Sequence, residues 1–319
     1  MGINSLLPYR LRNRRDATRH ARAIEDILQT PPVIPRNDGL VLFSMIGTAV
    51  ILPYLVAVKS LWNQLGRGRI VLLDDGTLTG RDKAVLARHC GDPEILAIRD
   101  VKLGPFPAGG TWERFLTILD RRQHEYWVQL NSDTVTMGPV PDILQAIASN
   151  RSFILLGDTE AGAAPLDLAQ FRTTRYPDGP EEGHIQTRIE SRLDLIPEAP
   201  RWHYIRGCSG FAGFAAGGQG RPLAASFMKA IEKLLGSEAL SEWGTEQVAS
   251  NFQISNDPNP VLLPYERYLN YWGEGWSKEA AFIHFVGTYR YHQDAYKRAS
   301  RIAIDELKSS TGWLGQKGQ

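Results

Sequence analysis

The sequence predicts a mixed α/β fold, with a mostly parallel central sheet flanked by helices and a less regular C-terminal half. Predicted strands and helices alternate at close intervals over residues 39–130, which is the pattern of such a sheet. Residues 158–200 instead carry many Gly, Pro and charged residues with weak periodicity. The 319 residues, 43% hydrophobic and 22% charged, are typical of a globular protein whose core needs no disulfide.

The first half contains the clearest elements. The segment at residues 39–46, GLVLFSMI, is short, apolar and rich in strand-forming residues. Over Ile51–Leu65 apolar residues recur every three or four positions and Gly66 follows, which predicts a helix and its end. We also expect strands at Arg69–Leu73, Glu94–Ile98 and Tyr126–Leu130, and helices from a Thr79 cap to Cys90 and over Trp112–Arg122.

The second half gives weaker signals. The segment GCSGFAGF at residues 207–214 predicts a strand, or a turn that another backbone approaches closely. Residues 158–200 predict a long loop that is functional or mobile. The remaining elements that we expect are helices at Arg221–Leu235 and Glu242–Phe252 and short strands at Val261–Pro264 and Ala281–Phe285.

A cluster of arginines near the N-terminus allows two interpretations. One is a solvated, partly frayed arm that leads into a helix near Ala21–Leu28. The other is peripheral docking to an anionic membrane surface or to a polyanionic partner. The arginines are Arg10, Arg12, Arg14, Arg15, Arg19 and Arg22.

Charge, cysteines and hydropathy limit the partners and the compartment. A formal net charge of +1 gives no reason to expect nucleic acid as a partner. Cys90 and Cys208 stand far apart, which fits two small buried apolar residues in a reducing cytoplasm. No apolar run of signal-peptide length follows Met1, and no stretch of about 20 apolar residues occurs. We therefore expect a cytoplasmic protein, peripheral to the inner face of a membrane if the docking interpretation holds.

Two polar residues follow a predicted buried strand in YWVQLNSDTVT, residues 126–136. In an extended chain, side chains two residues apart point to one face, so Asn131 and Asp133 could approach the same cation. Amide and carboxylate oxygens suit Mg²⁺ or Mn²⁺, which keep positions open for phosphate oxygens. The alternative is an Asx-turn that simply ends the strand.

A second element near the C-terminus, IHFVGTYR at residues 283–290, places His284 at the end of a short apolar strand. Its imidazole would complete a mixed nitrogen and oxygen site for a metal such as Mn²⁺. Gly287 would let the backbone approach a ligand closely, and Arg290 could pair with phosphate through two donors. Taken alone, His284 is more typical of a structural histidine.

Together these segments resemble the GT-A-fold glycosyltransferases, most nearly the family-8-like retaining enzymes. In that family a strand runs into Asp-x-Asp, and His-Phe-x-Gly-x-x-Lys stands near the C-terminus. The counterparts here are the NSD of residues 131–133 and the HFVGTYR of residues 284–290. Further similar segments, in the family's order, are YLVAVKSLW at residues 54–62, GCSGFAGF at 207–214 and WGTEQVASNF at 243–252.

The resemblance implies transfer of a sugar from a nucleoside-diphosphate sugar, such as a UDP-sugar, to an acceptor hydroxyl of a saccharide, lipid or protein. Asp133 and His284 would hold a divalent cation, Mn²⁺ or Mg²⁺, with Asn131 as a weaker third contact. The departure from the family is Asn131, because an amide removes one charge from the cation's shell and should weaken its binding.

The other implied contacts are Gly287 and Arg290 at the diphosphate, Asp74 or Asp75 near the nucleoside, and Glu246 and Gln247 at the sugar or acceptor. A retaining reaction by the front face needs no strong protein base, whereas inversion needs a carboxylate, for which Glu246 is the candidate. The implied division is a basic arm and helix at residues 1–38, a nucleotide-sugar-binding half at 39–150, an acceptor-binding and metal-completing half at 151–296, and a tail at 297–319.

Other interpretations stay open. Asp74-Asp75-Gly76-Thr77 is as typical of a turn as of a nucleotide contact. Aromatic residues around Gly273 and Gly275 predict core packing, or else a platform for a sugar ring. The chain could also be a catalytically impaired GT-A-fold protein that binds a nucleotide or a partner. A nucleotidyltransferase is less favoured, since no Gly-rich basic loop follows the first strand.

Overall fold

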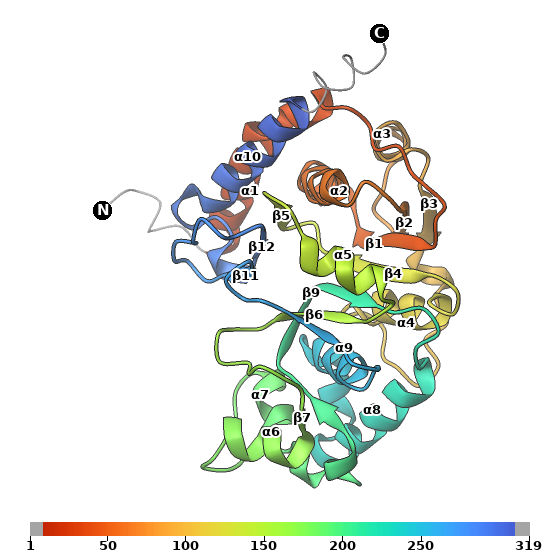
Figure 1. Ribbon diagram of the computed structural model, residues 1–319, viewed down its shortest axis with the longest axis vertical. Helices are drawn as coiled ribbons and strands as arrows, with labels where there is room; N and C mark the ends of the chain where they lie inside the picture. The colour runs from red at the N-terminus through yellow and green to blue at the C-terminus, as the bar shows by residue number, and fades with distance from the viewer. Residues whose placement is uncertain (1–8, 310–319) are drawn as a thin grey trace.

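The computed structural model describes residues 9–309, and their side chains from Leu11 onward. Within this part of the chain, seven strands form a central sheet in the order β10-β6-β9-β4-β1-β2-β3 (Figure 1). Their bounds are β1 Leu40–Ile46, β2 Arg69–Asp74, β3 Glu94–Ala97, β4 Tyr126–Leu130, β6 Phe153–Leu156, β9 Gly207–Phe214 and β10 Val261–Leu263.

The pairing of these strands is mostly parallel. β1 is parallel to β2 and to β4, β2 is parallel to β3, and β6 is parallel to β10. Only β9 runs against its neighbours β4 and β6 within the described sheet. β4 and β6 therefore run in the same direction, and their carboxyl ends meet at one edge of the sheet. The predicted class, a mixed α/β fold with a mostly parallel central sheet flanked by helices, is confirmed.

Helices cover both faces of the sheet, and each face has its own hydrophobic core. α2, α5 and α10 contribute to the core on one face, and α4, α8 and α9 contribute to the core on the other. Figure 1 shows α2 and α3 on one side of the sheet and α8 and α9 on the other. The bounds are α2 Ile51–Leu65, α3 Gly80–Cys90, α4 Trp112–Arg121, α5 Pro141–Ala148, α8 Arg221–Leu235, α9 Thr245–Ser255 and α10 Ala295–Ser309.

Local signals in the sequence explain the ends of the best-predicted helices. α2 ends where Gly66 takes a left-handed conformation, with φ 63°, and its N–H bonds to the carbonyl of Trp62. α3 begins at a reciprocal capping box, in which Thr79 and Asp82 bond to each other's backbone N–H. Both helices match the predicted boundaries.

A small sheet of three strands, in the order β11-β12-β5, lies beside the central one. β12 is antiparallel to β5, and this register places His284 opposite Thr134. The strands are β5 Thr134–Thr136, β11 Tyr268–Tyr271 and β12 Phe282–Phe285. The pairing joins segments of the chain about 150 residues apart, and it brings the two motifs of the sequence together.

Residues 158–200 do not form one long loop, so that prediction is wrong. They contain β7 (Leu166–Asp167), which pairs with β8 (His203–Tyr204), and the helices α6 (Leu168–Arg175) and α7 (Ile185–Glu190). Apolar side chains of both helices are buried in the second core. The helices are 8 and 6 residues long, which is too short for a clear periodic signal.

The predicted N-terminal arm is also wrong for the described residues, since α1 extends over Tyr9–Ala23 and a 3₁₀ turn follows at Glu25–Gln29. Tertiary contacts hold this polar helix against α10 (Figure 1). His20 is buried, stacks on Tyr296 with ring centroids 3.9 Å apart, and contacts the Ser300 hydroxyl at 3.2 Å. Arg19 pairs with Asp294.

α10 also takes in much of the segment that we expected to be a C-terminal tail, up to residue 309. Residues 1–8 of the predicted arm and 310–319 of the predicted tail lie outside the described residues. Among the residues described, no helix has the length and the apolar character needed to cross a membrane.

Candidate functional site

Three side chains that the sequence singled out converge at the edge of the two sheets. Oδ1 of Asp133 lies 3.2 Å from Nε2 of His284, and Arg290 forms an ion pair with Oδ2 of the same carboxylate. Asp133 and His284 are both buried, whereas the Arg290 side chain is partly exposed. Residues far apart in sequence thus form one charged group.

The small sheet explains this convergence. The backbone N–H of Phe285 donates to the carbonyl of Asp133 at 2.8 Å, which ties the end of β12 to the turn before β5. Gly287 then begins a 3₁₀ turn with φ 42°, a conformation that favours glycine, and the turn returns Arg290 toward Asp133. Arg290 Nε also donates to the carbonyl of Phe285 at 3.2 Å.

The imidazole of His284 is held in one orientation. Its Nδ1 lies 2.9 Å from Oδ1 of Asn270 and 3.4 Å from Sγ of Cys208. Gly210 lies directly against the ring, because a Cβ at that position would come within 2.3 Å of Cε1 of His284. This close approach explains a glycine in β9. Cys208 is half-buried beside the imidazole, so the expectation of a fully buried apolar residue is wrong for it, while Cys90 is buried as expected.

The charges in this group stabilise one another. Burial would raise the pKa of Asp133, but the charges of His284 and Arg290 outweigh it and hold that pKa below its usual value. Burial would lower the pKa of His284, but the neighbouring Cys208 sulfur and Asp133 carboxylate outweigh it and raise that pKa. The ionised carboxylate is therefore the stable form of Asp133.

Asn131 belongs to a neighbouring group. β4 ends at Leu130 and residues 131–133 form a turn, so the alternation of an extended chain does not apply to Asn131 and Asp133. The amide oxygen of Asn131 accepts a hydrogen bond from Arg114, a buried residue of α4. The structure thus brings Asp133 and His284 together and gives Asn131 a different partner. The metal role of all three residues stays a prediction.

Glu246 and Gln247 stand at the start of α9, and Arg114 links Glu246 to Asn131. One carboxylate oxygen of Glu246, Oε2, accepts from Thr111 at 2.8 Å and from Arg114 at 3.2 Å. Gln247 accepts from the backbone N–H of Ser209 at 3.1 Å through its Oε1. Arg114 therefore contacts both Asn131 and Glu246, and joins the ends of β4 and α9.

Glu246 has the electrostatics of a functional acid. Burial raises its pKa, while Arg114 and the hydroxyls of Thr111 and Ser209 oppose that change. Its other oxygen, Oε1, is buried and has no hydrogen-bond partner among residues 9–309. A buried carboxyl group with a raised pKa and an unpaired oxygen is typical of sites that handle a substrate.

Asp74 and Asp75 lie at the same edge of the sheet, at the end of β2. Asp74 forms the predicted turn, since its Oδ1 accepts from Gly76 at 2.8 Å and its Oδ2 pairs with Lys83 at 3.1 Å. Asp75 is exposed, and its carboxylate lies against the backbone of Gly47, which follows β1. The carboxylate of Asp75 also bonds within the turn, since it accepts from the backbone N–H and the hydroxyl of Thr77 at 2.9 and 2.6 Å. The turn interpretation therefore accounts for both residues, and a nucleoside contact by either stays a prediction.

The donor set is compatible with one cation held by Asp133 and His284. Oδ1 of Asp133 and Nε2 of His284 face each other at 3.2 Å, and a cation held by both would replace the proton of the imidazole, because only the neutral ring binds a metal. Over residues 9–309, however, no group of three or more His, Cys, Asp or Glu side chains is placed to hold a metal ion. Two protein ligands leave the remaining positions of such an ion to phosphate oxygens and water.

Sequence reasoning missed Arg114, Ser209 and Asn270. Arg114 stands in WERFLTIL, where residues 112–119 are all buried, and an arginine in such a helix requires a partner. That local signal was available in the apolar pattern of the segment. Ser209 and Asn270 carried no such signal, because their roles depend on contacts with residues distant in the sequence.

No protein-family model and no curated protein matches the chain. Among solved structures, the chain is similar to the apo form of the bifunctional glycosyltransferase WbbM, with 11% identity and a TM-score of 0.48 over 87% of this chain. It spans 53% of the WbbM chain, or about half its length.

Two further solved structures are an active-site mutant of LgtC and mouse xyloside xylosyltransferase 1 in its apo form. The LgtC alignment has 11% identity and a TM-score of 0.49, and covers 83% of this chain and 95% of that one. The alignment with the mouse enzyme has 13% identity and a TM-score of 0.40, and it covers 77% of this chain and 97% of the mouse chain. Each TM-score lies below 0.5, so no activity is transferred from these proteins to this chain.

Proposed function

We propose that this protein is a GT-A-like glycosyltransferase that moves a sugar from a nucleoside-diphosphate sugar, such as a UDP-sugar, to an acceptor hydroxyl. The observation that carries the proposal is the convergence of Asp133, His284 and Arg290 at the carboxyl edge of the sheet, with Arg114 and Glu246 beside them. In sheets of this kind, ligands bind beyond the carboxyl ends of the strands.

The first group would bind the diphosphate. Arg290 is partly exposed and offers a planar guanidinium that suits phosphate oxygens. A divalent cation held by Asp133 and His284 would supply further positive charge for the leaving diphosphate. Asp133 keeps its negative charge beside Arg290, so the pair stays oriented while the donor is absent.

The second group would bind the transferred sugar. Arg114, Asn131 and Glu246 present a buried guanidinium, an amide and a carboxyl group, all of which bond well to sugar hydroxyls. The acceptor oxygen forms a bond to the sugar carbon as the bond from that carbon to the diphosphate oxygen breaks. The diphosphate leaves with the bonding pair. The proton of the acceptor goes to the diphosphate in a retaining reaction, or to Glu246 in an inverting one.

The test of the proposed function is release of nucleoside diphosphate from UDP-glucose, UDP-galactose or UDP-N-acetylglucosamine in the presence of Mn²⁺ or Mg²⁺. We expect Asp133→Asn, which removes one charge at constant size, to lower that release at least about 100-fold. Asp305→Asn, at an exposed position of α10, should leave it unchanged. The proposal is contradicted if the wild-type protein turns over none of the donors, or if Asp133→Asn turns them over at the wild-type rate.

A second candidate is a GT-A-fold protein that binds the nucleotide without turnover. The contact of Asn131 with Arg114 favours it, since this amide oxygen is engaged away from the pair of Asp133 and His284. Binding of UDP with no turnover of any donor would support this candidate over the enzyme.

A further inference from the structure

A cavity lies at the same edge of the sheet as the candidate site. The cavity measures about 470 Å³, and its walls come from α6, α7 and the segments after β6 and before β9. β6 and β4 run in the same direction, so Asp158 after β6 and Asn131 after β4 lie at one edge. A volume of about 300–1,000 Å³ is usual for a small-molecule site.

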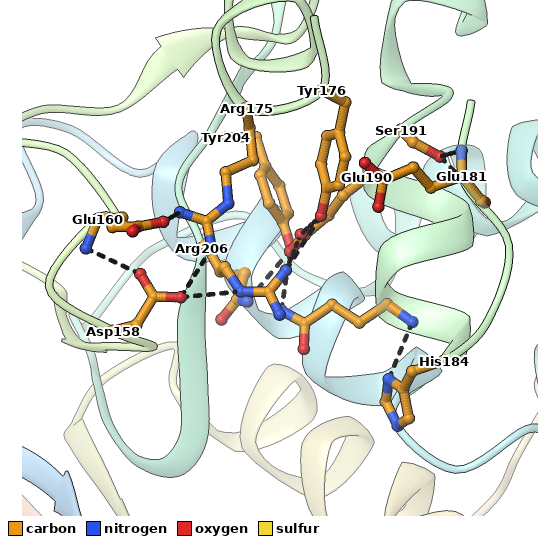
Figure 2. A network of polar contacts seen from close by, with 12 residues as sticks. Asp158, Glu160, Arg175, Tyr176, Glu181, His184, Glu190, Ser191, Tyr204 and Arg206 are labelled. Atoms are coloured by element: carbon orange, nitrogen blue, oxygen red, sulfur yellow. Dashed lines mark hydrogen bonds and ion pairs between the residues drawn. The ribbon is translucent and has the colours of Figure 1, made fainter. Parts of the chain in front are cut away.

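A buried hydrogen-bond network supports the cavity. Glu190 is fully buried and accepts from the hydroxyls of Tyr176 at 2.7 Å and Tyr204 at 2.8 Å. Arg206 pairs with the same carboxylate and donates to the Tyr176 hydroxyl at 3.1 Å. Figure 2 shows Arg206 between Asp158 on one side and Tyr176 with Glu190 on the other. The side chains that line the cavity, Tyr176 and Arg206, are thus held in place before any ligand binds.

The positive charges around the cavity already have carboxylate partners. Arg175 pairs with Asp158 and with Glu160, each at 2.9 Å. Arg206 pairs with Glu190 and lies 3.5 Å from Asp158. Three carboxylates therefore surround two guanidinium groups, and an anionic ligand would add to a local excess of negative charge. An apolar chain would remove these charges from water without offering hydrogen bonds. A neutral ligand rich in hydroxyl groups avoids both costs.

A chain of hydrogen bonds connects this network to the candidate site. Gln186 donates to Glu190 at 2.8 Å, and its Oε1 accepts from Gln247 at 2.8 Å. Gln247 in turn accepts from the backbone N–H of Ser209, whose hydroxyl lies 3.2 Å from Glu246. Gln186 and Gln247 therefore link the network that supports the cavity to the proposed sugar-binding group.

We propose that this cavity binds the acceptor and that the acceptor is a neutral saccharide, an inference that rests on the proposed function. Phe171 and Leu166 give the cavity an apolar face for the C–H face of a sugar ring. Arg175, Thr174 and Thr187 line the cavity with groups that bond to hydroxyls. The acceptor would enter over α6 and α7 and present a hydroxyl toward Glu246.

The test fills the cavity without disturbing the network. Thr174 is an exposed residue of α6 that lines the cavity, so Thr174→Trp places a large side chain in it. Thr173→Trp is the matched control, because Thr173 is exposed on the same helix and does not line the cavity. Binding of the methyl glycosides of glucose, galactose and N-acetylglucosamine, and of methyl glucuronide, is measured by saturation-transfer NMR on the full chain.

We expect at least one neutral glycoside to bind to the wild type and to Thr173→Trp with the same Kd, and at least tenfold more weakly to Thr174→Trp. The proposal is overturned if no neutral glycoside binds to the wild type, if Thr174→Trp binds it as tightly, or if the glucuronide binds better. Donor turnover with water as acceptor separates the two proposals. Thr173→Trp should keep that turnover and transfer to the glycoside, whereas Thr174→Trp should lose the transfer. No turnover in the wild type contradicts the proposed function alone, and turnover in a wild type that binds no neutral glycoside contradicts the acceptor proposal alone.

Discussion

At the scale of single residues, the main feature is a pair of neighbouring charged groups that share no side chain. Asp133, His284 and Arg290 form the first, and Arg114 joins Asn131 to Glu246 in the second. An amide at position 131 suits this arrangement, because a second carboxylate there would compete with Glu246 for the one guanidinium of Arg114. This competition is a local structural reason for an amide in place of an acidic residue at position 131.

Glu246→Gln tests the second group. Glutamine keeps the size of the side chain and an acceptor oxygen for Thr111, but it loses the charge and the titration of the acid. We expect donor turnover to fall by about 100-fold or more, as for loss of a group that acts on a proton or on developing charge. The measurement is the rate of nucleoside diphosphate release at saturating donor.

The matched control is Glu232→Gln, at an exposed position of α8, which should retain the wild-type rate. A Glu246→Gln protein that stays folded and turns over the donor normally would remove Glu246 from the site.

At the scale of elements, the ends of several strands and helices are tied together by polar contacts. Tyr296 of α10 donates to the carbonyl of Ser132 at 3.0 Å, so the last helix supports the turn that carries Asp133. On the other face, Arg122 at the end of α4 makes two hydrogen bonds to Asp257 after α9, at 2.7 and 3.1 Å. Ser152, which precedes β6, donates to the same carboxylate at 2.6 Å.

Asp257→Asn tests the second of these contacts. The side chains of Arg122 and Asp257 are each 1% exposed, so the variant leaves a buried guanidinium without its counter-charge. We expect the free energy of unfolding to fall by about 3–5 kcal/mol. Urea denaturation followed by circular dichroism measures the change.

Arg201→Gln provides the comparison, because it breaks the exposed ion pair with Glu198. It should lower the free energy of unfolding by less than about 1 kcal/mol. If the free energy of unfolding falls equally in the two variants, the buried ion pair stabilises the fold no more than a surface ion pair does.

At the scale of the whole molecule, the site is supported by α1 and α10 and is built from residues of both halves of the chain. α1 and α10 pack together beside the small sheet, and residues from 114 to 290 meet at the edge of the central one (Figure 1). His20 is buried between these helices and lies at 5.8 Å from the ring of Tyr291, measured between ring centroids. Loss of this packing would loosen the segment that presents Arg290.

The pH dependence of folding follows from His20. Burial, with the charge of Arg290 as a smaller cause, lowers the pKa of His20 from 6.5 to about 4. Between these values the unfolded chain binds a proton that the folded protein does not, so stability falls as the pH falls from about 6.5 to about 4. His89, with its pKa also lowered to about 4 by burial, adds to the same trend.

We expect His20→Gln to be less stable than the wild type at pH 7, because the ring contact is lost, but to lose less stability between pH 6.5 and 4. Urea denaturation at a series of pH values gives both quantities. A variant whose stability changes with pH as steeply as that of the wild type would assign the acid sensitivity to other groups.

Much of the fold was predictable from the sequence, because its signals are local. Apolar periodicity with caps predicts α2 and α3, and alternation of strands and helices predicts the parallel part of the sheet. The pairing of β5 with β12 was not predictable from local pattern, since it joins segments about 150 residues apart. The short helices α6 and α7 gave too few turns for a periodic signal.

The candidate site was predictable only in part. The residue types of Asp133, His284 and Arg290 indicated a charged site, and the structure brings them together. Arg114 was missed because its role depends on a partner 132 residues away, although its position in a buried helix was a signal. The different environment of Asn131 arises from a turn that the strand pattern did not indicate.

The central claim is that Asp133, His284 and Arg290 form a cation–diphosphate site, and calorimetric titration of UDP tests it most directly. The titration is run with and without Mn²⁺, on the wild type and on Asp133→Asn. We expect Mn²⁺ to tighten UDP binding to the wild type at least tenfold, and Asp133→Asn to abolish that gain. UDP binding that is equally tight without Mn²⁺ and in the variant, or no binding to the wild type, would contradict the claim.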